Sequence, residues 1–286
     1  MAVKLVGKGN ANILLQIDES GSLYRCCIKY PDSVNQCNQY TKENHAFIEG
    51  KILSLFPGGL ICSMELVEIP IEVVLDLHRE YVNCSSLSGS DKILCFKLPN
   101  LKDTRVFTNT VQQDHQTKIY ANEDYSRILI EIKPKWLDYP TSYCRNCVDN
   151  SRKGRNIEYC YSKLLKDSAE LNKIINSQTR EVVPSQFIEM ITKYLKGKDN
   201  VLQEIFTAQR IVQKRINKNQ SNGLTDLQLL MTLRDVTCFI EWDDTMKTVD
   251  ELKVNIVDVD LKTPDKFDHW RHTEQLLEAY PDKTFH

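Results

Sequence analysis

A glycine-containing loop between two short apolar segments constrains the beginning of this chain most strongly. Residues 4–6 and 13–17 are typical of strands, and the loop that connects them is Gly7-Lys8-Gly9-Asn10-Ala11-Asn12. A dinucleotide-binding βαβ unit requires a helix directly after its glycine loop, and the pattern of residues 13–17 is not helical. The loop therefore predicts the turn of a two-stranded hairpin.

Glycines between paired strands let backbone N–H groups approach nucleotide phosphates, as in the hairpin that covers ATP in kinase-type folds. Folds of this type also carry a lysine for the phosphates on their third strand. Residues 23–30 are predicted to form that strand, so Lys29 is the candidate and Arg25 is the alternative. The competing interpretation is an ordinary turn, because the pair Gly7 and Gly9 is not specific by itself.

Strands and helices are segregated along the chain. The predicted strands are residues 4–6, 13–17, 23–30, 60–68, 91–98, 127–132, 236–242 and 253–259. The predicted helices are 41–55 with Thr41 as the N-cap, 70–81, 159–215 with breaks at 177–179 and 196–200, 224–234 and 265–280. The stretch from residue 102 to residue 126 is mostly polar and is predicted to be irregular. This order favours an α+β protein with two lobes, residues 1–101 and 102–286.

Aspartates bracket the last pair of predicted strands. Asp235 precedes the strand 236–242, and Asp258 and Asp260 close the strand 253–259. In kinase-type sites one aspartate accepts the proton of the acceptor hydroxyl, and another, after the following strand pair, holds Mg²⁺. Asp235 and Asp258 occur in this order. The alternative is an ordinary hairpin with acidic ends.

The charges of the chain nearly cancel, but they are unevenly distributed. There are 37 Lys and Arg against 39 Asp and Glu, a formal net charge of −2, which excludes binding of nucleic acid by bulk positive charge. Residues 133–155 nevertheless hold six basic and two acidic residues, and Pro134 stiffens the backbone between Lys133 and Lys135. Such a segment suits a small anion with several charges. An ordinary solvated loop is the alternative.

Three of the ten cysteines, Cys144, Cys147 and Cys160, are close in sequence. Thiolates at this spacing can hold Zn²⁺. A fourth ligand is not evident, since the histidines are all distant in sequence: His45, His78, His115, His269, His272 and His286. Free structural thiols are therefore the alternative interpretation.

The sequence also bears on location. It contains no run of about 18 apolar residues, the length needed to span a bilayer. The first sixteen residues lack the apolar core and the cleavage site of a secretory leader. We therefore expect an intracellular protein that is not secreted, has reduced thiols and does not associate with membranes.

Several segments together resemble the inositol-pentakisphosphate 2-kinase family, especially its short fungal members. They are GKGNANILL, YRCCIKY, EIKPKW, YCRNC with the later KGR and YCYSKLL, MTLRDVTCFIEW, and NIVDVDLK. The resemblance implies a two-lobed inositol-phosphate kinase fold, distantly like protein kinases, with an enlarged C-terminal lobe that binds inositide. It also implies ATP- and Mg²⁺-dependent phosphorylation of the 2-hydroxyl of inositol 1,3,4,5,6-pentakisphosphate, giving inositol hexakisphosphate (phytate).

The resemblance assigns roles to individual residues. Asp235 corresponds to the catalytic aspartate and Asp258 to the Mg²⁺ ligand. The family signature ExKPK comprises Glu131, Lys133, Pro134 and Lys135. The expected substrate-binding residues are Lys133, Lys135, Arg145, Lys153, Asn200, Lys262, Lys266 and Trp270. The expected nucleotide-binding residues are Gly7, Lys8, Gly9, Asn10, Ala11, Asn12, Lys29 and Asn100, the last in a hinge at residues 99–101.

Two other functions fit the same residues. One is an inositide-binding scaffold with altered catalysis, and the other is a kinase of the same fold that acts on a different inositol phosphate. A protein kinase is disfavoured, because neither His-Arg-Asp nor Asp-Phe-Gly occurs. The resemblance further implies a nuclear location and a structural zinc in parts of the family, and we expect a monomer.

Overall fold

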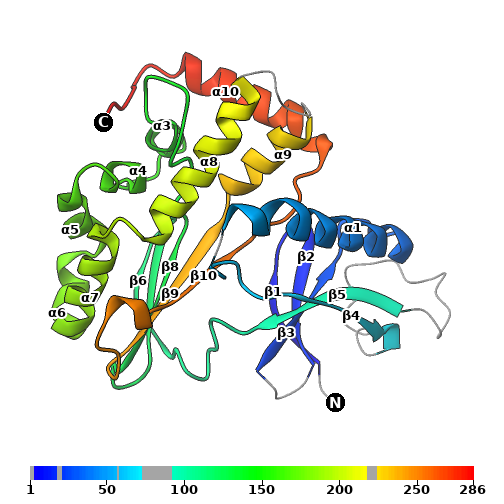
Figure 1. Cartoon of the computed structure of the whole chain (residues 1–286), viewed down its shortest axis with the longest axis horizontal. Helices are drawn as coiled ribbons and strands as arrows, with labels where there is room; N and C mark the ends of the chain where they lie inside the picture. The colour runs from blue at the N-terminus through cyan, green and yellow to red at the C-terminus, as the bar shows by residue number, and fades with distance from the viewer. Residues whose placement is uncertain (1–2, 18–20, 57, 73–91, 218–223) are drawn as a thin grey trace. The chain divides into compact units, whose positions relative to one another are not determined.

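The computed structural model describes residues 3–17, 21–56, 58–72, 92–217 and 224–286. The chain divides into two compact units, Met1–Ser54 with Ile61–Asp103 and Leu55–Leu60 with Thr104–His286. Each unit contains a five-stranded antiparallel sheet together with helices (Figure 1). The predicted α+β class is therefore confirmed. The second unit also takes in Leu55–Leu60, which the predicted boundary places in the first lobe.

The first sheet has the strand order β1-β2-β3-β5-β4. Its strands are β1 (Lys4–Lys8), β2 (Asn12–Gln16), β3 (Ser22–Cys27), β4 (Glu65–Pro70) and β5 (Lys92–Pro99). The predicted hairpin around the glycine loop is thus confirmed, with β1 antiparallel to β2. Lys29 lies two residues beyond β3, however, so its predicted place on that strand is wrong. Beyond the strand, the amide of Ile28 still donates to the carbonyl of Ala11 at 2.8 Å, and the amide of Lys29 donates to the sulfur of Cys27 at 3.4 Å.

Helix α1 (Val34–Phe47) begins earlier than predicted. Ser33 is its N-cap, and the hydroxyl of Ser33 accepts a hydrogen bond from the amide of Gln36 at 3.2 Å. Thr41, the predicted cap, lies inside the helix, where its hydroxyl donates to the carbonyl oxygen of Cys37. The polar residues in the first turns obscure the helical pattern in the sequence. The buried positions nevertheless recur at helical spacing: Val34, Cys37, Tyr40, Thr41, Asn44 and Phe47.

Two short turns continue the chain after α1. They are the π-helical turn η1 (Ile48–Ile52) and the 3₁₀ turn η2 (Leu53–Leu55), so the predicted end of this helical stretch is confirmed. Of the helix predicted at residues 70–81, all but the first three residues lie outside the described part of the chain, and so does Pro57.

The second sheet has the strand order β10-β9-β8-β7-β6. Its strands are β6 (Asn109–Gln113), β7 (Thr117–Ala121), β8 (Arg127–Ile132), β9 (Thr237–Asp243) and β10 (Lys253–Val257). β6 and β7 fall in a stretch predicted to be irregular, and that prediction is wrong. β6 is a largely polar edge strand, which backbone pairing with β7 holds in place without an apolar pattern. β8 is the middle strand, and every residue after Arg127 is buried.

Helices make up most of the rest of the second unit. They are α3 (Arg145–Arg152), α4 (Tyr161–Leu164), α5 (Leu171–Ile174), α6 (Ser177–Val182), α7 (Ser185–Lys196), α8 (Val201–Asn217), α9 (Leu224–Leu233) and α10 (Phe267–Ala279), with the 3₁₀ turns η3 (Ser168–Glu170), η4 (Val249–Glu251) and η5 (Pro264–Lys266). The helical stretch predicted at 159–215 is confirmed in outline. A break was predicted at Ser177, but α6 begins there because Asn176 caps it.

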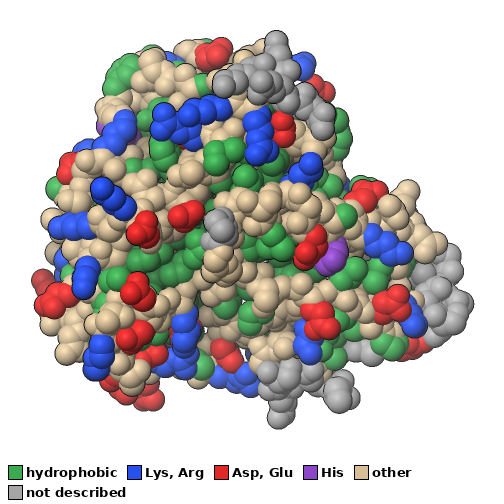
Figure 2. Space-filling model, viewed as in Figure 1, with side chains coloured by type: hydrophobic (Ala, Val, Ile, Leu, Met, Phe, Trp, Pro, Cys, Tyr) green, Lys and Arg blue, Asp and Glu red, His purple; other side chains and the backbone are tan. Residues whose placement is uncertain are grey.

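Aromatic packing joins the helices to the second sheet. The rings of Phe187 in α7 and Trp242 in β9 meet edge to face with centroids 5.7 Å apart, and both side chains are essentially buried. Within the described residues, no helix is both long and apolar enough to cross a bilayer. Acidic and basic side chains are interspersed over the face shown in Figure 2.

Replacing the N-cap of α1 tests where this helix begins. Ser33→Ala removes the acceptor of the Gln36 amide, so we expect the free energy of unfolding to fall by about 1 kcal/mol in chemical denaturation. Thr41→Val serves as the control, because the Cys37 carbonyl keeps its helical amide partner when the hydroxyl is lost. An equal loss in both variants would contradict the assignment of Ser33 as the cap.

Candidate functional site

The EIKPKW segment begins in the central strand β8 and leaves the sheet in a tight turn. Glu131 is buried and accepts a hydrogen bond from the hydroxyl of Tyr120, while the ammonium of Lys118 lies 3.5 Å from its carboxylate. The amide of Lys135 donates to the carbonyl of Lys133 at 2.9 Å, which closes the turn around the proline. The sheet thus anchors the signature at Glu131, and the turn sets the direction of Lys135.

The carboxylate of Asp235 lies between two lysine ammonium groups. Lys135 contacts one of its oxygens at 2.5 Å, and Lys262 contacts the other at 2.8 Å. These residues come from the end of β8, the end of α9 and the segment after β10, which are far apart in sequence. The structure therefore brings together three of the residues predicted for the site.

The two lysines determine the charge of Asp235. Burial by itself raises the pKa of this carboxyl group, but the charges of Lys262 and Lys135 and their hydrogen bonds outweigh burial, so the pKa lies below its ordinary value. Asp235 is therefore a carboxylate at neutral pH. A carboxylate can accept the proton of a hydroxyl group but cannot donate one.

Asp258 follows β10 in an unusual backbone conformation. Its φ is 60°, in the left-handed region, which Asp tolerates better than most residues. Its side chain is exposed, and the hydroxyl of Thr237 donates to its carboxylate at 2.7 Å. This contact orients an exposed carboxylate, the kind of oxygen ligand that Mg²⁺ prefers.

Helix α9 holds the segment that carries Asp258 and Lys262. The hydroxyl of Thr232 donates to the carbonyl of Asp260 at 2.6 Å, and the side-chain amide of Gln228 donates to the carbonyl of Lys262 at the same distance. Asp235 follows directly after the same helix. One helix thus fixes the relative positions of the predicted base and the segment that contains the predicted Mg²⁺ ligand.

Two predicted substrate residues belong to α3 and its end. Arg145 is buried, with its Nε 2.8 Å from the carboxylate of Glu274 and its guanidinium against the ring of Trp136. Lys153 lies at the C-cap of α3, and its ammonium contacts Asp149 at 2.6 Å. Both side chains have acidic partners in the same unit. The contact between Trp136 and Arg145 was not predicted, although the aromatic residue directly after the signature could have suggested a partner for a nearby cation.

The other predicted substrate residues lie elsewhere in the second unit. Asn200 is buried, and its side chain accepts hydrogen bonds from the amides of Leu202 and Gln203 and so begins α8. Lys266 is exposed at the start of α10, and Trp270 packs against Phe267 in the same helix. The structure gives Asn200 a capping role, and contact of these residues with substrate stays a prediction.

The predicted nucleotide residues lie in the first unit. Neither Gly7 nor Gly9 has a positive φ, and a Cβ there would meet its nearest atoms at an ordinary 3.6 Å. The hairpin itself therefore does not require glycine, whereas close approach of a ligand to the backbone would. The Lys29 ammonium lies 5.5 Å from the ring centroid of Tyr40 in α1. The loop is otherwise formed by Lys8, Asn10, Ala11 and Asn12.

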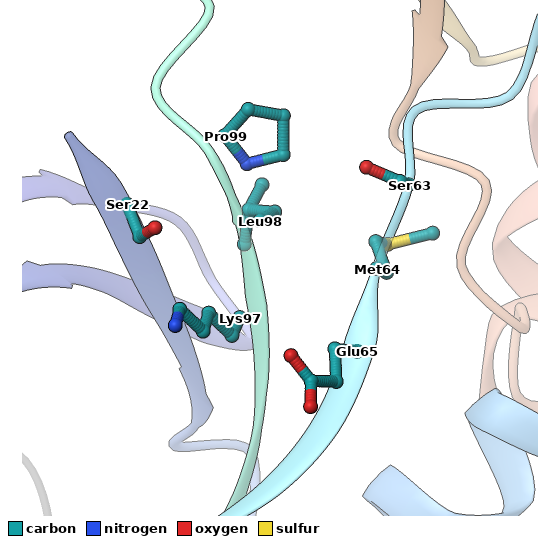
Figure 3. A pocket seen from close by; sticks show the side chains of 7 residues that line it. All are labelled: Ser22, Ser63, Met64, Glu65, Lys97, Leu98 and Pro99. Atoms are coloured by element: carbon teal, nitrogen blue, oxygen red, sulfur yellow. The ribbon is translucent and has the colours of Figure 1, made fainter. Parts of the chain in front are cut away.

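A pocket of about 410 Å³ opens beside the predicted hinge in the first unit (Figure 3). Its lining residues are Ser22, Ser63, Met64, Glu65, Lys97, Leu98 and Pro99. Ser22 pairs with Pro99, and Glu65 pairs with Lys97, across the neighbouring strands β3, β5 and β4. Asn100 follows the pocket in sequence, and its amide donates to the carbonyl of Gly21 at 3.0 Å.

His286 completes a group of possible metal ligands that the sequence left incomplete. Its ring nitrogen and the sulfurs of Cys144, Cys147 and Cys160 all lie within 4.8 Å of one another. The sulfurs of Cys144 and Cys160 are 3.7 Å apart, close to the roughly 3.8 Å between two thiolates on a tetrahedral zinc ion with bonds of about 2.3 Å. Hydrogen bonds from the thiols of Cys147 and Cys160 lower the pKa of Cys144. Four ligand atoms of the types that zinc prefers are therefore close together.

Comparison with known proteins adds an independent finding. The family model described as inositol-pentakisphosphate 2-kinase matches residues 6–276. The chain is 35% identical to the inositol-pentakisphosphate 2-kinase of Saccharomyces cerevisiae, with 99% of both chains covered. It is also 35% identical to the enzyme of that name from Candida glabrata, with 96% of both covered, and 31% identical to that of Eremothecium gossypii, with 99% of this chain and all of the other covered. The chain therefore belongs to the inositol-pentakisphosphate 2-kinase family.

Proposed function

We propose that this protein transfers the γ-phosphate of ATP to the 2-hydroxyl of inositol 1,3,4,5,6-pentakisphosphate and so produces the hexakisphosphate. Family membership supports the reaction class. The observation that carries the assignment to particular residues is the carboxylate of Asp235 held between Lys135 and Lys262. A base beside two cations matches a substrate that presents one free hydroxyl among phosphates.

The charge of the substrate accounts for the number of basic residues. Five phosphates with up to about two charges each bring roughly ten negative charges, which cations have to compensate. In our proposal the phosphates are bound by Lys133, Lys135, Arg145, Lys153, Lys262 and Lys266, with further contacts from Asn200 and Trp270. The ammonium groups of Lys135 and Lys262 contact Asp235 in the structure, so phosphate binding would partly replace that contact.

Asp235 then orients the hydroxyl and accepts its proton. A carboxylate with a lowered pKa is a weak base, so proton transfer would be late in the reaction, after phosphoryl transfer has begun. The main contributions to catalysis are then positioning and compensation of charge. Asp258 would hold Mg²⁺, which supplies positive charge to the phosphates of the nucleotide.

The first unit is assigned to the nucleotide. The glycine loop with its exposed Gly9, Lys29 beside α1, and the hinge residue Asn100 support this assignment. A nuclear location and a monomeric state stay predictions from the family resemblance.

Turnover of a panel of inositol phosphates with ATP and Mg²⁺ tests the proposed function. We expect the pentakisphosphate with a free 2-hydroxyl to be the preferred acceptor and the hexakisphosphate to be its product, identified by anion-exchange chromatography. Preference for another inositol phosphate would favour the alternative kinase. Tight inositide binding without turnover would favour the scaffold.

Asp235→Asn tests the assigned base. The amide keeps the shape but cannot accept the proton, so we expect kcat to fall by roughly 10²- to 10⁴-fold. Affinity for the pentakisphosphate, measured by titration calorimetry, should stay similar, because the variant weakens the contact that assembles the two lysines but also removes a negative charge that competes with the phosphates for them. Asp250→Asn is a matched control, since it removes the same charge from an exposed position in η4. Near-normal activity of Asp235→Asn would show that another residue is the base.

Lys135→Ala separates substrate binding from nucleotide binding. Loss of a hydrogen bond to a charged group weakens the free energy of substrate binding by about 1.5–3 kcal/mol, so we expect KM for the pentakisphosphate to rise by about 10- to 100-fold. KM for ATP should hardly change, and Lys196→Ala, at an exposed position in α7, should change neither. A parallel rise in KM for ATP would instead place Lys135 at the nucleotide.

We also propose that Cys144, Cys147, Cys160 and His286 hold a structural zinc ion. The separation of the ligand atoms and their chemical types support this assignment. The hydroxyl of Ser162 lies 3.1 Å from the sulfur of Cys160 and 3.2 Å from the ring nitrogen of His286, so it can support these ligands. Zinc would crosslink α3, the start of α4 and His286.

Metal analysis of the purified protein tests the zinc proposal. We expect about one zinc ion per chain by mass spectrometry of the metal content and a large loss of zinc in Cys160→Ser. Cys62→Ser is the control, because this buried thiol belongs to the other unit. Chelation should also lower the melting temperature of the wild type but not of Cys160→Ser. Wild-type protein without zinc, or equal zinc in both variants, would contradict the proposal.

A further inference from the structure

Trp136, the residue directly after the signature lysine Lys135, has a backbone conformation that is unusual for its size. Its φ is 55°, in the left-handed region where bulky residues are rare. Such a conformation persists only where the surroundings fix it. The surroundings of this side chain therefore indicate what the conformation achieves.

The indole ring of Trp136 lies between two arginines. The guanidinium carbon of Arg145 is 3.4 Å from the ring centroid, and that of Arg234 is 4.0 Å from it. Two planar cations this close to one centroid would overlap on a single face, so they occupy opposite faces. Guanidinium groups stack well on aromatic rings, and the attraction is stronger where water is excluded. Both arginines are at least nine-tenths buried.

Hydrogen bonds fix both cations in this stack. The Nε of Arg145 is 2.8 Å from the carboxylate of Glu274 in α10. An Nη of Arg234 donates to the side-chain oxygen of Gln213 in α8 at 2.8 Å and to the carbonyl of Asp138 at 3.2 Å. The ring is thus held between two side chains whose own positions are set by other elements.

The two like charges explain why a ring between them is useful. Burial and, to a smaller extent, the charge of Arg145 lower the pKa of Arg234 to about 9, although the carboxylates of Asp138 and Glu274 oppose both effects. Arg234 stays cationic at neutral pH. The ring separates the two guanidinium groups and offers an electron-rich face to each.

The stack connects the two halves of the candidate site. Trp136 follows Lys135, and Arg234 precedes Asp235, so one contact joins the backbones that carry the ion-paired lysine and aspartate. The fully buried Gln209 makes a second connection between the same segments, since its side chain donates to the carbonyl of Leu233 and accepts from the amide of Asp138.

We propose that Trp136 is a positioning residue, whose stack between Arg145 and Arg234 sets the separation of Lys135 from Asp235 and holds Arg145 in place for a substrate phosphate. This inference rests on the proposed function. A ring that stacks on guanidinium groups is required for the role, whereas apolar bulk alone is not sufficient.

Trp136→Leu and Trp136→Phe separate these two requirements. Leucine keeps apolar bulk without an aromatic face, and phenylalanine keeps a smaller face. We expect kcat/KM for the pentakisphosphate to fall at least tenfold in Trp136→Leu and to stay within about threefold of wild type in Trp136→Phe. KM for ATP should change less than twofold in both, because the residues proposed to contact the nucleotide directly lie in the other unit.

Phe206→Leu is the matched control, since it removes a ring near Arg210 within α8 and should leave the kinetics unchanged. Melting temperatures establish that each variant is folded. Equal kinetics of Trp136→Leu and wild type would overturn this positioning role, and so would equal losses in the leucine and phenylalanine variants. Neither result would affect the proposed function. A parallel rise in KM for ATP would also overturn the positioning role. Absence of turnover in the wild type would contradict the proposed function itself.

Discussion

The arrangement of the candidate site depends on one carboxylate that holds two lysines together. Without Asp235, the ammonium groups of Lys135 and Lys262 would repel each other in a partly desolvated place. A site for a highly charged anion has to keep its cations assembled before the anion arrives. The same carboxylate is the proposed base, so one residue can serve both needs.

Helix α9 and the sheet give this cluster its geometry. β8 anchors the signature at the buried Glu131, while hydrogen bonds from Thr232 and Gln228 fasten the segment after β10 to α9. The Trp136 stack and Gln209 join the signature turn to the end of α9. Each of the charged residues is therefore supported by contacts outside the ion pairs, as preorganised electrostatic sites require.

Much of the fold could be predicted from apolar patterns, because strands and helices that bury one face repeat those patterns. β8 was predicted with its observed bounds. The misses have particular causes. Polar first turns hid the start of α1 at Ser33, and the edge strand β6 is held by backbone pairing, which leaves little trace in side-chain polarity. In the site, the proposed base and the signature residues could be named from motifs, whereas the parts played by Trp136, Arg234 and His286 could not.

The sequence by itself determined the family, the α+β class, the glycine hairpin and the chemical types in the site, since motifs and periodicity are local properties of the chain. Only the tertiary structure decided that Lys135 and Lys262 share one carboxylate, that His286 joins the three cysteines and that Trp136 lies between two arginines. These contacts join residues far apart in sequence. Their distances follow from how the sheet and helices pack, which no local pattern encodes.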